Sequence, residues 1–347
     1  MKINRLLLMS FLMLSLLGAP LFAQEEMNEP DLRVGGLPVS NGIPSALALL
    51  LGYFEEAGFA VELVPAASAQ ELRELMEAGE LDGFQADLIT TLVLIENGLD
   101  LRLVRHVEMT NHPDFAIVAN AASGIESAEE LPGASIAIST RTVVQYLADQ
   151  LLASAGVSPD EVEYVNVPWI FSRYEMLQQG EVDVALLPQP FLAHAVIAGH
   201  HVLVDDSAAA YIPEAISFST AALAEKGDAV RAFLDVYERV LEITNAYEDR
   251  ESASEEWYNA QLQAQVFAGL MRLQATTDPA LVDALVQYVT LHDTSGIWIH
   301  LSTAAVPTEE EFAHAQDWAL AAGLVSETRE YENVIDGSFL PAMMEEE

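Results

Sequence analysis

The chain has 347 residues, enough for two domains, and its 51% hydrophobic content argues against disorder. It contains no cysteine, which excludes disulfides, zinc–thiolate sites and thiol nucleophiles. A formal net charge of −40 would repel phosphates, so we expect no nucleic-acid partner. The acidic residues are spread over the whole chain, which favours a solubilising surface over a site for a cationic ligand.

Residues 1–23 predict a secretory signal peptide. Lys2 and Arg5 precede an apolar run from Leu6 to Leu17, and Ala23 is a small residue suited to cleavage. No cysteine follows this run, so we expect no lipid anchor, and no later stretch reaches the roughly 18 uncharged apolar residues that a membrane span requires. The mature protein is therefore expected to be periplasmic or secreted.

Short apolar runs alternate with amphipathic stretches between residues 31 and 205. This alternation indicates parallel sheets joined by right-handed crossovers through helices. Ser68, followed by Glu71, is typical of a capping box at a helix start. The predicted strands are 31–36, 60–66, 81–87, 134–139, 162–167 and 182–187. The predicted helices are 44–57, 68–79, 87–98, 142–156 and 172–180.

The order of these elements occurs twice. The phrases "MEAGELDG" and "LQQGEVDV" are nearly the same, and their glycines, Gly79 and Gly180, stand at equivalent helix ends. A repeat of about a hundred residues predicts two α/β lobes. The chain is expected to pass between them near residues 114–120 and to return near 215–220.

These crossings define the expected domains: lobe 1 comprises residues 31–116 and 216–345, and lobe 2 comprises residues 120–205. After residue 221 the pattern changes to amphipathic helices, which we expect to pack onto lobe 1. Their predicted ranges are 227–248, 255–275, 279–290 and 308–322. The acidic end, "MMEEE", is expected to be frayed.

At this point the chain resembles a known family, the solute-binding proteins of ABC importers, in the subgroup associated with nitrate, sulfonate, taurine and thiamine-precursor uptake. The matching stretches are "GYFEEAGFAVELVP" (52–65), "ELMEAGELDGFQADL" (74–88), "LPGASIAIST" (131–140), "YLADQLLASAGVSPDEVEYVNVP" (146–168) and "RYEMLQQGEVDVALLPQPFLAHA" (173–195).

The resemblance implies a type II periplasmic-binding-protein fold, with two α/β lobes, two crossover strands and a helical C-terminal region. It also implies a cleft that closes on a small-molecule solute. We further expect an ABC permease as partner, a monomer, and neither cofactor nor metal. In one position the chain departs from the family, because Ala86 stands where serine or threonine is frequent.

Ligands of open parallel sheets bind beyond the carboxyl ends of the strands. This rule locates the candidate site in the loops that follow the predicted strands and in the loop that follows residue 106. The candidate ligand-binding residues are Ser40, Asn41, Ser68, Gln85, Asp87, Asn111, Thr140, Arg141, Thr142, Trp169, Gln189 and Phe191.

Each candidate also has a structural interpretation. Ser68, Asp87 and Thr140 stand where helices begin and are also suited to capping them. Arg141 is either an anion clamp at a helix start or a surface arginine paired with an acid. Trp169 either stacks on a flat ligand or covers the core. For Arg173 we favour a structural role, and Gln189 forms either a ligand contact or a plain strand-to-helix corner.

A metal site is not expected. His106, Glu108, His112 and Asp114 lie close together in the sequence, but their spacing fits no standard helix-borne site. The pattern as a whole favours a non-catalytic binding protein. Two alternatives remain: an enzyme on the same fold, such as a lyase or a pyrimidine-forming enzyme, and a sensor subunit that presents its ligand to a membrane receptor.

Overall fold

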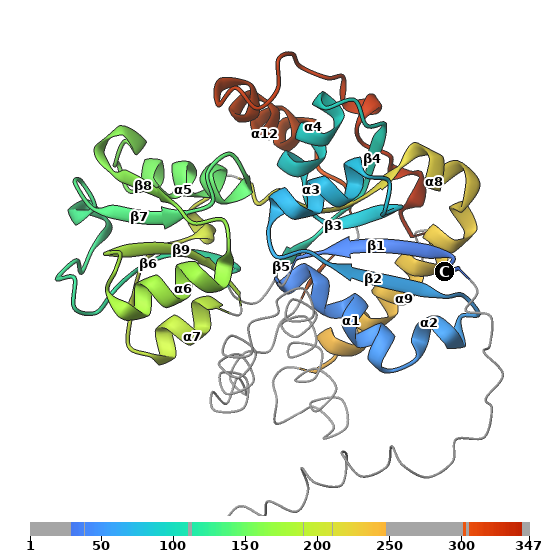
Figure 1. Cartoon of the computed structure of the whole chain (residues 1–347), viewed down its shortest axis with the longest axis horizontal. Helices are drawn as coiled ribbons and strands as arrows, with labels where there is room; N and C mark the ends of the chain where they lie inside the picture. Colours follow the sequence, from blue (N-terminus) through green and yellow to red (C-terminus); the bar gives the residue numbers. More distant parts are fainter. Residues whose placement is uncertain are drawn as a thin grey trace, which may run out of the picture. The chain divides into compact units, whose positions relative to one another are not determined.

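The computed structural model describes residues 29–37, 39–109, 113–189, 191–209, 211–247, 301–302 and 305–341. Its contacts separate Met1–Pro30 from Asp31–Glu347, and the fold below is that of the second unit (Figure 1). The predicted signal peptide, the predicted helices 255–275 and 279–290, and the "MMEEE" end lie outside the described residues.

The first sheet has five strands in the order β2-β1-β3-β11-β4. Strand β1 is parallel to β2 and β3, whereas β11 is antiparallel to both of its neighbours. The strands are β1 (Leu32–Gly36), β2 (Val61–Pro65), β3 (Gly83–Asp87), β4 (Leu101–His106) and β11 (Glu214–Ser219).

The second sheet has the order β10-β6-β9-β7-β8. Read from its β8 edge it repeats the first sheet, with β6 as the antiparallel strand in the place of β11. The repeat predicted from the sequence is therefore confirmed, and β6 and β11 are the two crossover strands. The strands are β6 (Phe115–Ala119), β7 (Ser135–Ile138), β8 (Glu163–Asn166), β9 (Val184–Pro188) and β10 (His201–Asp205).

Both crossover strands belong along their whole length to the sheet that they enter. Phe115 and Ala116, expected at the end of lobe 1, already pair with β9 of the second sheet. Glu214 and Ala215 already pair with β3 of the first sheet, ahead of the expected return at residue 216. The reason is that both crossover strands are buried over nearly their full length, so their backbone groups need ladder partners from the first residue.

The helices of the first lobe differ from the prediction at one point. The single helix expected over 44–57 is divided into two, because Gly52 adopts a left-handed conformation with φ 73°. The helices are α1 (Ile43–Leu50), α2 (Tyr53–Glu56), α3 (Ala69–Glu77) and α4 (Leu88–Glu96), preceded by the 3₁₀ turn η1 (Ser40–Gly42).

The second lobe contains the helices α5 (Val143–Ser154), α6 (Ile170–Gln179) and α7 (Phe191–Ile197). Gly79 and Gly180, predicted as equivalent helix stops, both have positive φ just after α3 and α6. Short 3₁₀ turns are η2 (Ala128–Glu130), η3 (Pro159–Glu161) and η4 (Asp206–Ala208).

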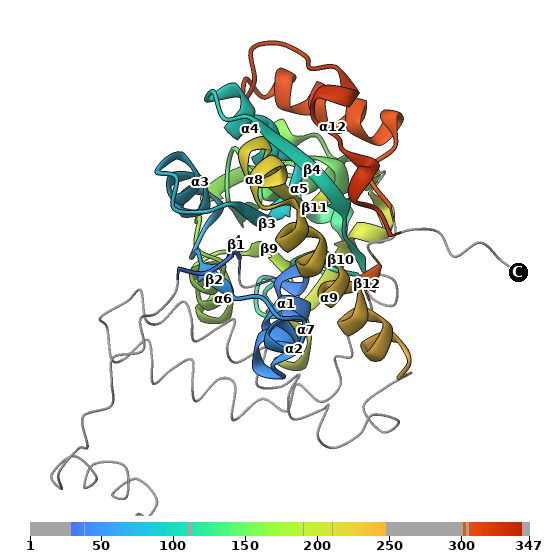
Figure 2. The same cartoon turned by 90° about the vertical axis from the view of Figure 1, so that its right-hand side faces the viewer.

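The chain then returns to the first lobe. Helix α9 buries the apolar face predicted from its period and packs on α1 and α2 (Figure 2). At this contact Phe233 stacks on Phe54, with 5.6 Å between the ring centroids. The elements of this region are α8 (Thr220–Glu225), α9 (Gly227–Asn245), β12 (Leu301–Ser302), which pairs with β5 (Glu108–Met109), α12 (Glu309–Ala321), η6 (Tyr331–Asn333) and η7 (Gly337–Phe339).

Helix α12 contacts both lobes. It packs on α4 of the first lobe, as expected, but its Trp318 Nε1 also donates to Asp149 of α5 at 2.8 Å. The ring of Trp318 also packs edge-on against Tyr146 of α5. Among the described helices, none is both long and apolar enough to cross a membrane.

Candidate functional site

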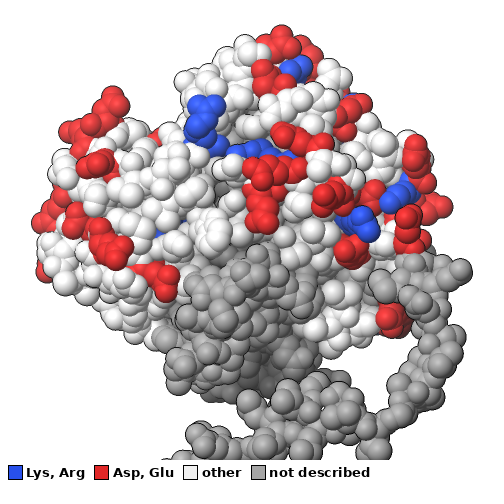
Figure 3. Space-filling view, viewed as in Figure 1, with Lys and Arg blue, Asp and Glu red and all other residues white. Residues whose placement is uncertain are grey.

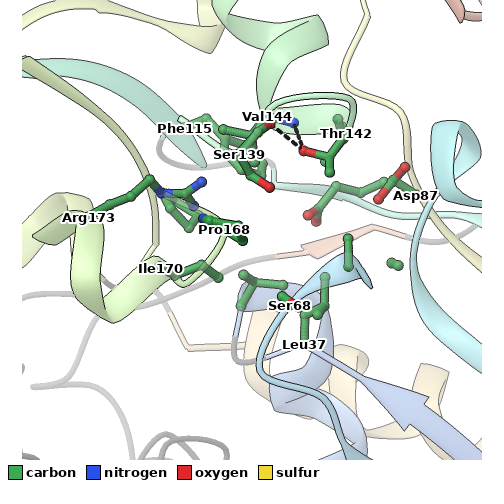
Figure 4. A pocket seen from close by; sticks show the side chains of 16 residues that line it. Leu37, Ser68, Asp87, Phe115, Ser139, Thr142, Val144, Pro168, Ile170 and Arg173 are labelled. Carbon is green, nitrogen blue, oxygen red and sulfur yellow. Dashed lines mark hydrogen bonds between the residues drawn. The ribbon is translucent and has the colours of Figure 1, made fainter. Parts of the chain in front are cut away.

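A pocket lies between the two sheets, at the carboxyl ends of their strands. Its volume is about 480 Å³, which includes solvent at its open mouth. Residues of both sheets line it, and most of the lining is apolar, with Leu37 on one side and Phe115 and Ile170 on the other (Figure 4). An apolar pocket with a few polar groups is typical of sites for small molecules.

The first lobe contributes side chains that cap helices. Ser68 accepts a hydrogen bond from Glu71 N and so caps α3, as predicted. Glu71 bonds to the backbone N–H of Ala67, so the pair does not form the reciprocal capping box. Asp87 caps α4 by accepting from Thr90 N at 2.6 Å. Both Ser68 and Asp87 also line the pocket, so their capping role and their place in the site coincide.

Asp87 is almost fully buried, and its charge is correspondingly costly. Desolvation raises its pKa to about 6, against the hydrogen bonds from Thr90 and the charge of Arg73. Arg73 stands on α3, and its own pKa is lowered by burial although Asp87 acts to raise it. Arg73 was not among the candidates, because an arginine within a charged helical stretch gives no sign in the sequence that its charge acts on a pocket residue such as Asp87.

The second lobe contributes hydroxyls and one arginine. Thr142 caps α5 by accepting from Val144 N, donates to Ser139 O at 2.8 Å and lines the pocket. Arg173 of α6 is 1% exposed and lies across the pocket from Asp87 (Figure 4). The sequence favoured a purely structural role for Arg173; the structure places it in the pocket wall, where a buried guanidinium can contact an anionic group.

A group of buried carboxyls stands beside the pocket. Glu214 lines it, and Asp114, just before β6, accepts from Ser40 Oγ at 2.8 Å. Burial raises the pKa of Asp114 to about 7 and that of Glu214 well above its ordinary range. Asp206 accepts from the N–H groups of Asp114 and Phe115, and burial raises its pKa to about 6.

Two candidates of the first lobe, Asn41 and Gln85, form a polar network inside the protein. Gln85 Nε2 donates to Asn41 O at 2.8 Å, and Gln85 Oε1 accepts from Ser45 Oγ at 2.6 Å. Asn41 O also accepts from Tyr237 Oη at 2.7 Å. Ser40, Asn41 and Gln85 are buried and are not part of the pocket lining, because their hydrogen bonds are made to the protein.

The candidates at positions 140 and 141 lie at the end of the β7–α5 loop and outside the pocket lining. Thr140 N donates to Asn166 Oδ1. Arg141 is exposed and has φ 61°, the only positive φ of a non-glycine residue in the described part of the chain. Its Nη2 donates to Gly323 O at 3.3 Å, so it bonds to the backbone that follows α12.

The remaining candidates lie around α6 and α7. Trp169 is 46% exposed, while its neighbours Pro168 and Ile170 line the pocket. Gln189 Nε2 donates to Pro113 O, and its Oε1 accepts from Ala193 N, so both ends of its amide are bonded to the protein. Phe191 is buried against Tyr174. Asn111 lies outside the described residues.

Charge is distributed unevenly over the surface. Acidic side chains are scattered over the face drawn in Figure 3; some Lys and Arg side chains lie beside the hollow between the two lobes, and others lie singly at the top and on the right of the view. Arg73 and Arg141 belong to opposite lobes, yet the charge of Arg141 acts on the pKa of Arg73, so the two guanidiniums lie within electrostatic reach of each other. Within the described residues, His, Asp and Glu form no group of three suited to a metal ion.

Comparison with known structures identifies the fold as that of periplasmic binding proteins. The periplasmic aliphatic sulphonate binding protein SsuA from Escherichia coli matches with a TM-score of 0.66 at 16% identity, covering 91% of this chain and 94% of that one. The desulfurization enzyme DSZB matches with a TM-score of 0.55 at 15% identity, covering 89% and 96%. At such identities the likeness shows the fold alone.

Within this class of fold, the chain belongs to the NMT1/THI5-like family, whose model matches residues 40–250, more than half of its length. A putative thiamine biosynthesis protein from Haemophilus influenzae is 27% identical over 180 residues, which are 51% of this chain and 54% of that protein. The chain thus spans about half the length of the curated relative it matches. The family predicted from the sequence motifs is confirmed.

Proposed function

We propose that the protein is an extracytoplasmic solute-binding protein, which captures a small polar or aromatic molecule and delivers it to an ABC permease. The observation that carries the proposal is the pocket between the carboxyl ends of two sheets, lined by side chains from both. A ligand there contacts both lobes at once, so its binding energy can favour the closed arrangement of the lobes. The sulphonate binding protein with the same fold supports this function.

The residues that line the pocket suggest which chemical groups the ligand carries. Buried Arg173 suits a sulfonate or carboxylate, whereas Asp87 and Glu214 suit the amine or ring N–H donors of a pyrimidine-like molecule. Apolar side chains such as Phe115 and Ile170 suit an alkyl chain or a flat ring. Ser68, Asp87 and Thr142 are the predicted contacts that we retain in the pocket, with Arg141 and Trp169 as contacts at its rim.

A thermal-shift screen of the purified chain tests the proposal, with alkanesulfonates, carboxylates and aminopyrimidines as three separate panels. A ligand at 100 times its Kd adds about 2.7 kcal/mol to the free energy of unfolding. We expect one panel to raise Tm and calorimetry to give a micromolar Kd, about −8 kcal/mol. If no panel shifts Tm, the proposal is wrong.

Arg173→Met then locates the site. Losing a hydrogen bond to a charged ligand group costs about 1.5–3 kcal/mol, so affinity for an anionic solute should fall by about 10- to 150-fold. The matched control is Arg231→Met on α9, whose guanidinium lies over the ring of Phe339. Equal affinities of the two variants would remove Arg173 from the site.

A second candidate function is an enzyme on the same fold, favoured by the likeness to DSZB. The absence of cysteine rules out a thiol nucleophile, but the buried carboxyls of the pocket could transfer protons. Mass spectrometry of the bound solute after prolonged incubation separates the two functions. A binding protein returns the solute unchanged, and a stoichiometric or catalytic loss of solute would favour the enzyme.

Export, delivery and a monomeric state are also part of the proposal. Residues 1–23 fused to a reporter should direct its export, and light scattering should give the mass of one chain. Uptake of the bound solute by vesicles that carry the partner permease would separate a transport protein from a sensor subunit, which would bind the solute without stimulating uptake.

A further inference from the structure

Helix α12 is attached to the first lobe, mainly through the chain that follows it. Leu103 of the edge strand β4 bonds to that chain twice: its N–H donates to Val334 O at 2.8 Å, and its C=O accepts from Asp336 N at 2.9 Å. Glu96, the last residue of α4, forms an ion pair with Arg329 at 3.1 Å. The chain after α12 therefore extends the first lobe and holds the helix to it.

The same helix reaches α5 of the second lobe through two aromatic rings. Trp318 Nε1 donates to Asp149 Oδ2 at 2.8 Å, a hydrogen bond to a carboxyl group. The Trp318 ring also packs edge-on against Tyr146, with 5.5 Å between the ring centroids. His314, one turn earlier on α12, packs edge-on against the same Tyr146 at 5.8 Å. Edge-to-face packing of this kind adds to the attraction that burial provides, so α12 is bound to both lobes.

Apolar packing connects the same three helices. One continuous hydrophobic cluster includes Leu92 of α4, Phe312 of α12 and Leu147 of α5, all of them buried. Just after α12, Gly323 O accepts from Arg141 Nη2 of the second lobe at 3.3 Å. None of these residues lines the pocket, so the contacts of α12 with the two lobes do not depend on a solute.

Other contacts between the lobes lie where the chain itself crosses. Ser40 Oγ donates to Asp114, immediately before β6, and Tyr146 Oη donates to Tyr211 O, on the return to β11. Element-terminal residues of this kind absorb the rotation when lobes move about a hinge. Bonds beside the crossings therefore restrain such a rotation little, whereas the contact of Trp318 with α5 joins two helices that no strand connects directly.

We propose that α12 is a brace between the lobes, with the bond from Trp318 to Asp149 as its attachment to the second lobe. The brace stabilises the arrangement in which the lobes lie close together, before any solute binds. When this attachment is broken, the lobes rotate apart about the crossover strands. A pocket between lobes that are already held together requires less of the solute's binding energy for closure.

Spin-label distances test the brace without any solute, so the result does not depend on the proposed function. Because the chain has no cysteine, Glu77→Cys on α3 and Asp160→Cys on η3 place one label on each lobe. Trp318→Phe keeps an aromatic ring and removes the donor to Asp149. The ratio of the longer to the shorter distance should therefore rise about tenfold over the wild-type background. Trp318→Ala, which also loses the ring, should increase this ratio further.

The matched control is Tyr164→Phe. Tyr164 Oη donates to the other oxygen of the same carboxyl group, Asp149 Oδ1, at 2.7 Å, but both residues belong to the second lobe. This variant loses a comparable hydrogen bond and should keep the wild-type distances. Unchanged distances in Trp318→Phe and Trp318→Ala would overturn the brace. Equal lengthening in Tyr164→Phe would also overturn it, because a change within the second lobe would then be sufficient. If Trp318→Ala does not fold, Trp318→Phe and the control decide between these outcomes.

Discussion

The third strands of the two sheets, β3 and β9, occupy the same place in the repeat but reverse the sizes of their side chains. In the first sheet Gly83 stands opposite Phe218 of the crossover strand. In the second sheet the equivalent Val184 stands opposite Ala119. Each sheet thus pairs one small residue with one large residue, on opposite strands. The comparison teaches that the small and the large residue of this one pair exchange strands between the two halves of the repeat.

The backbone hydrogen bonds beside Gly83 and beside Val184 are equivalent, although the side chains there differ. Ser219 N, at the end of one crossover strand, donates to Asp82 O at 2.9 Å, and Asn120 N, just after the other, donates to Asp183 O at 2.8 Å. The strands diverge again at their carboxyl ends. Strand β3 ends on Asp87, which caps a helix and lines the pocket, whereas β9 ends on Pro188, which lines the pocket without a polar group.

The largest effect is expected from making the first sheet resemble the second at one residue only. A Cβ on Gly83 would lie 2.2 Å from the ring of Phe218 and 2.5 Å from Ser217 O, so neither side chain nor backbone leaves room. Gly83→Val should therefore lower the free energy of unfolding by about 3 kcal/mol or more, as measured in urea.

The double variant sharpens this comparison. Phe218→Ala alone should cost about 3–5 kcal/mol, because Phe218 is fully buried. If the valine can occupy the space left by the phenylalanine ring, the double variant Gly83→Val with Phe218→Ala should lose less unfolding free energy than the two single variants together. We expect the difference to be about 1–3 kcal/mol. Additive losses would show that Gly83 is required by the backbone of Ser217 and that the likeness to Val184 and Ala119 is incidental.

The sequence was sufficient to predict the fold because several independent patterns in it indicate the same arrangement of strands and helices. The repeated phrases around Gly79 and Gly180 and the alternation of strands and helices define both sheets, and a period of 3.6 residues identifies the buried face of α9. The break at Gly52 was missed, since the apolar pattern continues through it and only the left-handed φ of the glycine reveals two helices.

The second prediction contrasts the polar end of β3 with the apolar end of β9. Asp87 has a raised pKa of about 6, so the stability that its protonated form provides is complete below about pH 4 and is lost as the pH rises through 6. Asp87→Asn keeps the helix cap and cannot ionise. Between pH 4 and pH 7, the free energy of unfolding of the variant should rise relative to that of the wild type by on the order of 2–3 kcal/mol. Urea unfolding across this range measures the gain, and exposed Asp160→Asn should show none.

The site was harder to predict than the fold. The end of a predicted strand indicates where a loop lies, but it does not indicate the direction in which the side chains of that loop point. Ser40 and Gln85 follow or end strands as a binding residue should, but Gln85 bonds to Asn41 and Ser45 inside the first lobe and Ser40 bonds to Asp114, just before β6. Arg173 lies within a helix, away from any strand end, and reaches the pocket only because α6 packs on β9.

The third prediction contrasts two helix starts that occupy equivalent places. Helix α3 is capped by Ser68, whereas α6 begins at Trp169 without a side-chain cap. Ser68→Ala should cost about 1 kcal/mol in urea unfolding, and Ser68→Asp should retain the cap and so cost less. Since Ser68 also lines the pocket, Ser68→Asp should nevertheless weaken the binding of an anionic solute. A loss of stability as large in the aspartate as in the alanine variant would mean that Ser68 contributes by packing.

The smallest effect is expected at Arg141, where the second lobe differs from the first in backbone conformation. Its φ of 61° is unfavourable for a side chain with a Cβ, by about 1–2 kcal/mol, and glycine avoids this cost at some loss of entropy. Arg141→Gly should therefore raise the free energy of unfolding by up to about 1 kcal/mol, whereas Arg141→Ala, which keeps the strain and loses the bond to Gly323, should not. If the two variants are equally stable, the strain is absent from the unliganded protein. If glycine stabilises the fold and weakens solute binding, the strained backbone serves to hold the guanidinium at the mouth of the pocket, where the acidic surface provides few other cations.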